Sequence, residues 1–174
     1  MRSLHQEGDL RPTAARVAER AGVSLRTVWQ HFVDLESLLV EAGRRDFEIA
    51  SACVTPIDPN QPLPARLQQL VEQRSALFDA IAPVWRAGRL QEPFSPQIQR
   101  NRDRLIEVGR AQLTRVFDQE LDALPAARRQ TTLNALEVAT SWAAWESLRS
   151  ELRLSNPEAQ QVVLSLTSNL LTTH

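Results

Sequence analysis

The sequence predicts an all-α protein with a helix-turn-helix domain over residues 1–45 and a larger helical bundle over residues 46–174. Apolar residues recur with helical spacing along nearly the whole chain, and strand-like alternation never lasts more than a few residues. Only 5 of the 174 residues are glycine, and strong helix formers predominate. Four prolines within residues 55–64 indicate a linker between helical segments.

Composition excludes several classes of protein. A hydrophobic share of 43% and a charged share of 24% are typical of a globular chain. One cysteine, Cys53, excludes a disulfide scaffold and a multi-thiolate metal site, and three widely separated histidines argue against a histidine-clustered metal site. We expect no cofactor and no metal. The opening segment MRSLHQEGDL lacks the apolar stretch of a signal peptide, so we expect a cytoplasmic protein without a membrane partner.

Two short helices are predicted near the start of the chain, over residues 14–21 and 25–31. Thr13 and Ser24 stand directly ahead of them and are good N-caps. Gly22 lies where the first helix must end, because glycine tolerates the left-handed conformation of a tight turn.

The spacing of Ala18, Gly22 and Val28 predicts how these helices meet. Ala18 allows close contact and Val28 packs back from the second helix, so the segment is predicted to be a helix-turn-helix. The second helix of such a unit enters the DNA major groove. Residues 11–32 contain four arginines and one glutamate, a net charge of +3 on a chain whose total is −1. This basic patch favours a DNA contact over a merely solvated helical hairpin.

Further helices are predicted along the rest of the chain by apolar stripes and by residues that begin or end helices. They are residues 35–53 begun by Asp34, residues 65–81 ended or kinked by Pro83, about 96–122 begun by Ser95-Pro96, about 125–152 begun by Pro125, and a last helix opened by the capping box Ser155-Asn156-Pro157-Glu158.

The stretch RVAERAGVSLRTVWQHFVDLESLL, residues 16–39, resembles the DNA-binding domain of TetR-family (tetracycline-repressor-like) transcriptional regulators. The matching features are AERAGVS, Thr27-Val28, His31-Phe32 and Leu38, while the remaining chain matches only in its helical architecture. The resemblance implies a repressor that binds a palindromic DNA operator as a homodimer and is released by a small-molecule effector.

Arg26, Thr27 and Gln30 share one face of the second helix, and arginine and glutamine are natural readers of guanine and adenine edges. The resemblance adds phosphate contacts by Trp29 and His31. The predicted DNA-binding residues are Thr13, Ser24, Leu25, Arg26, Thr27, Trp29, Gln30 and His31.

The sequence departs from the family pattern in three places, and two of them, Leu35 and the short segment before Gly8, support an alternative function. Trp29 stands where the family commonly has tyrosine, and Leu35 stands where it commonly has lysine. The family also has a full helix before the glycine matching Gly8, whereas seven residues precede it here, so the natural start is expected to lie upstream of Met1 or the domain is loose. The alternative is a helical ligand-binding or interaction module that has lost DNA binding.

Two arginines interrupt apolar stripes in the larger domain. In one interpretation, Arg74 and Arg102 lie at the edges of these stripes and reach solvent with their charged ends. In the other, they line a pocket for an apolar or amphipathic effector and pair with its anionic group. Nearby aromatic residues either form the walls of that pocket or pack in the core. The predicted effector pocket comprises Arg74, Phe78, Trp85, Phe94, Arg102, Leu105 and Trp142.

Residues 133–152 and the last helix are apolar on more than one side, which is typical of helices that pair with a second copy of the chain. The predicted dimer interface comprises Ala139, Ala143, Ser147, Val162, Leu166 and Leu170. An enzyme is disfavoured, since the sequence contains no nucleophile–base pair, metal cluster or phosphate loop.

Overall fold

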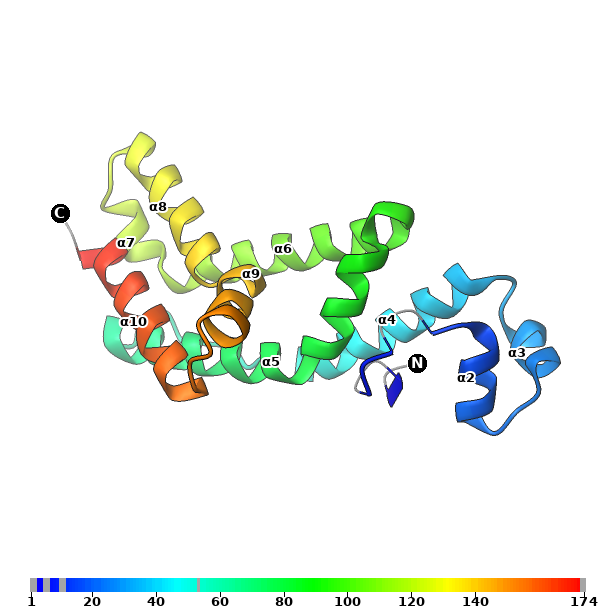
Figure 1. Ribbon diagram of the computed structural model, residues 1–174. Helices are drawn as coiled ribbons and strands as arrows, with labels where there is room; N and C mark the ends of the chain where they lie inside the picture. Colours follow the sequence, from blue (N-terminus) through cyan, green and yellow to red (C-terminus); the bar gives the residue numbers. More distant parts are fainter. Residues whose placement is uncertain (1–2, 5–6, 10–11, 53, 173–174) are drawn as a thin grey trace. The chain divides into compact units, whose positions relative to one another are not determined.

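The computed structural model describes residues 3–4, 7–9, 12–52 and 54–172. Every regular element in these residues is helical, which confirms the all-α prediction (Figure 1). None of the helices described is long and apolar enough to cross a membrane. The described residues also contain no group of three or more histidine, cysteine, aspartate or glutamate side chains that can hold a metal ion.

The chain folds into two compact units. The first combines residues 1–52 with residues 80–104, and the second combines residues 53–79 with residues 105–174. These spatial units interleave along the chain, so they do not coincide with the ranges 1–45 and 46–174. The assignment of those two ranges as functional domains remains a prediction.

The first unit begins with α2 (Ala14–Ala21), α3 (Leu25–His31) and α4 (Leu35–Ala52). It also contains the second half of α5 (Leu63–Gln91), the 3-10 turn Glu92–Phe94 and the start of α6 (Pro96–Val116). The bounds of α2 and α3 are those predicted from their caps, because both caps are local signals that act within one helical turn.

A small core holds the helix-turn-helix together. Leu4 is 2% exposed, so the short segment before Gly8 contributes a buried side chain to this core. The cluster comprises Leu4, Val17, Ala18, Val28 and Leu38, with Phe32 packed against it.

The second unit contains the first half of α5, most of α6, and four further helical elements. These are α7 (Asp118–Asp122), α8 (Ala126–Ala139), α9 (Trp142–Glu146) followed by the π-helical turn Ser147–Glu151, and α10 (Asn156–Thr172) (Figure 1). Their apolar faces enclose one core formed by Ile57, Leu67, Leu70, Leu113, Val116, Phe117, Leu121, Leu133, Leu136 and Leu171.

Three predicted helix bounds are wrong. Helix α5 continues through Pro83 to Gln91, because a proline inside a helix removes one backbone hydrogen bond and can kink the helix without ending it. The helix predicted over 96–122 breaks at Phe117, which has φ −120° and ψ 27°. The helix predicted over 125–152 breaks after Ala139, where Ser141 caps a new helix.

Other helix starts are confirmed by their capping bonds. Asp34 Oδ1 accepts the Ser37 N–H at 2.7 Å at the start of α4. Ser95 Oγ accepts the Ile98 N–H at 3.3 Å at the start of α6. At the start of α10, Glu158 accepts the Ser155 N–H at 2.7 Å, as a capping box requires.

Candidate nucleic-acid interface and ligand cavity

The turn between α2 and α3 has the geometry of a tight helix-turn-helix. Thr13 Oγ1 accepts the Arg16 N–H at 3.3 Å at the start of α2. Gly22 ends α2 with φ 66° and ψ 28°. This is a left-handed conformation that residues other than glycine rarely adopt. The Val23 N–H then donates to the Ala18 carbonyl at 3.0 Å, which closes the turn.

Ser24 fixes the start of α3. Its Oγ accepts the Thr27 N–H at 3.0 Å and lies 2.8 Å from the Thr27 hydroxyl. The Thr27 side chain is half-buried, and its hydroxyl is already hydrogen-bonded to Ser24. It is therefore less available to a base edge than the sequence prediction assumes.

The outer face of α3 is open to solvent. Arg26, Gln30 and His31 are exposed, and Leu25 and Trp29 are each 42% exposed. Val28, in contrast, is 6% exposed and belongs to the core. Within the described part of the chain, neither the Arg26 guanidinium nor the Gln30 amide has a hydrogen-bond partner.

Acidic neighbours reduce the positive charge that the sequence assigned to this segment. Arg16 pairs with Glu19 at 3.2 Å and lies 4.0 Å from Asp9. Arg20 pairs with Glu7. Arg11 lies outside the described residues. Since Glu7 and Asp9 precede the counted range, their effect could have been found by extending the charge count a few residues upstream.

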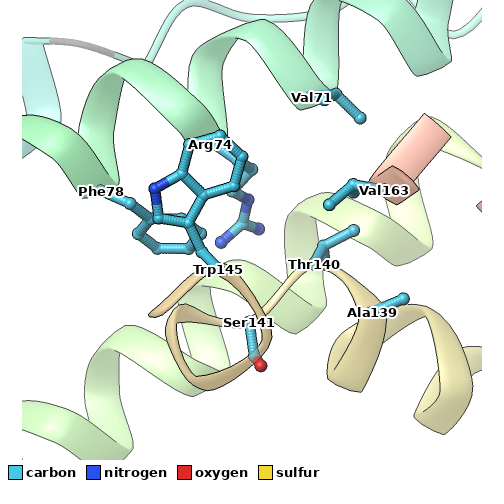
Figure 2. Close-up of a pocket in the computed structure, with 8 residues that line it drawn as sticks. All are labelled: Val71, Arg74, Phe78, Ala139, Thr140, Ser141, Trp145 and Val163. Carbon is cyan, nitrogen blue, oxygen red and sulfur yellow. The ribbon is translucent and has the colours of Figure 1, made fainter. Parts of the chain in front are cut away.

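The second unit contains a small cavity at the junction of α8 and α9 (Figure 2). The cavity has a volume of about 10 Å³, which is room for about one water molecule. Residues of α5 and α10 complete the walls. The cavity is lined by Val71, Arg74, Phe78, Ala139, Thr140, Ser141, Trp145 and Val163.

Arg74 brings a positive charge to this cavity. Its Nη2 donates to the Gly109 carbonyl at 3.3 Å and to Gln112 Oε1 at 3.0 Å, while its Nε is buried without a partner among the described residues. Burial lowers the pKa of Arg74 to about 10, and the negative charge of Glu137 opposes this effect. The arginine is therefore a desolvated cation held by neutral oxygen atoms.

Aromatic rings stand beside the arginine. The Phe78 and Trp142 rings meet edge to face with centroids 5.8 Å apart, and the Phe78 and Trp145 centroids are 6.4 Å apart. Trp145 lines the cavity, whereas Trp142 contacts Phe78 but does not appear in the lining. Such contacts hold Phe78 in a fixed orientation.

The structure brings together only part of the predicted effector pocket. Arg74 and Phe78 line the cavity, whereas Leu105 and Trp142 belong to the same unit without lining it. The remaining three predicted residues belong to the first unit, because α5 does not end at Pro83 and the chain after residue 79 joins the other unit. They are Trp85, Phe94, which is 79% exposed, and Arg102, which pairs with Glu92 and Asp103.

Sequence reasoning did not assign six of the cavity residues to a pocket: Val71, Ala139, Thr140, Ser141, Trp145 and Val163. The available signal was the serine at position 141, which is a good N-cap and accepts the Ala144 N–H at 3.2 Å. Apolar residues continue at helical spacing on both sides of Ser141, so the spacing did not reveal the break between α8 and α9.

The predicted dimer residues differ in their exposure. Ala143 is exposed and Leu166 is 48% exposed, whereas Ser147, Val162 and Leu170 are half-buried. Ala139 is 8% exposed and lines the cavity, so a single chain already covers it.

Comparison with known proteins gives one informative likeness. The fold is similar to the crystal structure of a transcriptional regulator from Rhodococcus sp. Rha1, with a TM-score of 0.76 and 18% sequence identity over 98% of this chain and 90% of that chain. No family model matches the sequence. No curated protein matches it significantly. At this level of identity, the likeness to the Rhodococcus protein shows that the two chains share a fold.

Proposed function

We propose that this protein is a DNA-binding transcriptional regulator of the TetR type, a repressor that binds a palindromic operator as a homodimer through α3. The observation that carries the proposal is the exposed Arg26 and Gln30 face of a helix whose start is fixed by Ser24. The fold shared with a transcriptional regulator supports it.

In this proposal the buried and exposed faces of α3 have different roles. Val28 and Ala18 keep α2 and α3 in contact, so α3 is presented as a rigid element. Arg26 contacts a guanine edge or a phosphate, and Gln30 contacts an adenine edge. A small apolar or amphipathic effector that binds in the second unit releases the operator.

The test is a gel shift with the DNA upstream of the gene, followed by binding-site selection. Arg26→Ala should weaken operator binding by about 1–3 kcal/mol if its base contact is bidentate. Gln30→Ala should change the selected sequence more than the affinity, because glutamine carries no charge. Arg115→Ala removes the same charge from an exposed position in the second unit and is the matched control. Unchanged affinity and an unchanged selected site for both α3 variants would contradict the proposal.

Salt dependence provides a second measurement of the same proposal. If a dimer neutralises about six phosphates, log K should fall with log salt at a slope near −5. A slope near zero would exclude groove binding by this motif.

The alternative is a helical ligand-binding or interaction module that does not bind DNA. It is favoured by the pairing of Arg16 and Arg20 with acidic neighbours, which leaves little free positive charge on α2. This alternative predicts no gel shift at any salt concentration.

A further inference from the structure

We propose that Leu25 and Trp29 of α3 read thymine in the operator by packing against its 5-methyl group, beside the base contacts of Arg26 and Gln30. The inference rests on the proposed function, because it concerns the same exposed face of α3. It adds an apolar component to a readout that the proposed function assigns to polar side chains. Leu25 and Trp29 are thereby specificity-determining residues.

Large apolar side chains are exposed in and around α3. Val23, Leu25 and Trp29 are each 42% exposed, and Val33, which follows the helix, is 95% exposed. All four fall within the short segment 23–33. Single exposed apolar residues are ordinary on a protein surface, whereas a group of them marks a surface that contacts another molecule.

The fold does not use Leu25 or Trp29 as core residues. The small core of the helix-turn-helix takes Val28 and Phe32 from this segment, and neither Leu25 nor Trp29 belongs to it. The apolar character of these two side chains therefore adds no core burial to the unit. A contact with another molecule gives it a role.

The helical repeat places Leu25 and Trp29 next to the proposed base readers. Successive residues of a helix are about 100° apart. Arg26 and Gln30 therefore lie opposite the buried Val28, at the centre of the exposed face. Leu25 and Trp29 each come one residue earlier, so they form an edge on one side of this polar pair. Since they are four residues apart, they are neighbours on the helix surface.

Thymine is the base that matches this arrangement. Its 5-methyl group is an apolar group in the major groove, and its partner adenine presents N6 and N7 to a glutamine. Where Gln30 reads an adenine, a thymine methyl group therefore lies in the same groove. A G·C pair presents no methyl group to an apolar edge. The face fits an A·T pair that is read by the glutamine and by the apolar edge together.

A protein partner is the other molecule that could cover an apolar helix edge. DNA is favoured because α3 contains no acidic residue, which would repel phosphate, and because the apolar edge borders the exposed Arg26. An edge that docks a protein predicts that no DNA sequence is selected.

The experiment compares thymine with uracil, which differ only in the 5-methyl group. The operator obtained by binding-site selection is prepared once with thymine and once with deoxyuridine at every thymine position. Gel shifts then measure the affinity of the full chain for both operators. If one methyl group is buried in each half-site, the thymine operator should bind about tenfold more tightly.

Variants of α3 assign this preference to side chains. Leu25→Ala and Trp29→Ala should each reduce it, and the double variant should bind the two operators equally. Trp29→Phe keeps an apolar ring without the indole N–H, so it should keep the preference. Leu90→Ala is the matched control, because Leu90 belongs to the same unit and is 43% exposed, and it should leave the preference unchanged.

The uracil operator separates a base contact from a loss of structure. The double variant should bind this operator about as tightly as the natural protein does, because the methyl group that the side chains contact is already absent. Both positions are exposed and alanine favours a helix, so circular dichroism should show an unchanged fold. If the double variant does not fold, an undiminished preference in both single variants overturns the inference.

The outcomes distinguish this inference from the proposed function. Equal affinity of the natural protein for the two operators would overturn the inference and leave the proposed function standing, since the operator is still bound. A thymine preference that survives the double variant would do the same, because other residues would then read the methyl group. A protein that selects no DNA sequence would contradict both.

Discussion

The indole N–H of Trp145 donates a hydrogen bond to Oδ1 of Asp79 at 2.9 Å, which ties α9 to α5 across 66 residues of sequence. The second carboxylate oxygen accepts from Asn156 Nδ2 at 2.8 Å, and Arg149 Nε lies 3.7 Å from Oδ1. One carboxylate thus joins four segments of the second unit. Because Trp145 lines the cavity, Asp79 also fixes the orientation of a cavity wall.

Asp79→Asn should therefore lower stability and loosen Trp145. The amide retains an acceptor for the indole but loses the negative charge that faces Arg149, and it cannot accept from both partners as the carboxylate does. We expect a loss of about 1–2 kcal/mol in urea unfolding and a change in tryptophan emission. Asp122→Asn, which removes the exposed ion pair with Arg129, is the control and should cost at most about 1 kcal/mol. Equal losses for the two variants would show that the Asp79 network adds nothing to stability.

Arg66, which is buried, forms an ion pair with the half-buried Glu120. Removing only one member of this pair should be costly. Arg66 is 2% exposed and donates to both carboxylate oxygens of Glu120, at 2.9 and 2.5 Å, as well as to backbone carbonyls. Arg66→Met alone should cost about 3–5 kcal/mol, because the Glu120 charge loses its partner. The double variant with Glu120→Leu should recover most of this loss in the same urea titration. A double variant no more stable than Arg66→Met would contradict the interpretation.

The same pair predicts a pH dependence. Burial alone would raise the pKa of Glu120, but hydrogen bonds and the charge from Arg66 outweigh burial and lower it below the ordinary value of 4.5. A lowered folded-state pKa means that the stabilisation is complete above the ordinary value and is lost as pH falls through the folded-state pKa. The stability difference between the natural protein and Glu120→Gln should therefore shrink below about pH 4.5. A difference that is constant from pH 7 to pH 3 would rule out this contribution.

Ser24→Ala should weaken the start of α3. The substitution leaves the Thr27 N–H without its acceptor and should cost about 1 kcal/mol. Hydrogen exchange at the Thr27 amide measures the local effect, and Ser24→Asn is the matched control because asparagine also caps helices well. If exchange in Ser24→Ala and Ser24→Asn is equally slow, the cap does not hold this helix.

The proposed homodimer makes Leu166 a sensitive position. Leu166→Arg places a charge where the proposal buries an apolar side chain, so light scattering should show monomer instead of dimer. Gln161→Arg adds the same charge to an exposed position on another side of α10 and should leave the dimer intact. A natural protein that is monomeric at micromolar concentration would contradict the proposal.

The sequence alone determined the features that depend on neighbouring residues. The caps at Thr13, Ser24 and Ser155 and the left-handed turn at Gly22 each act within about one helical turn, so residue type and spacing are enough to predict them. For the same reason the helix-turn-helix could be predicted together with its exposed face.

The tertiary structure alone decided which distant segments meet. Apolar spacing could not show that α5 continues past Pro83 or that the chain breaks at Ser141. A proline can kink a helix without ending it, and a break leaves the apolar spacing on both sides unchanged. The cavity depends on the break at Ser141, since Ser141 and the residues on either side of the break line it. It joins Arg74 and Phe78 to Trp145, and no periodicity within a helix encodes a contact between residues that lie more than 60 positions apart.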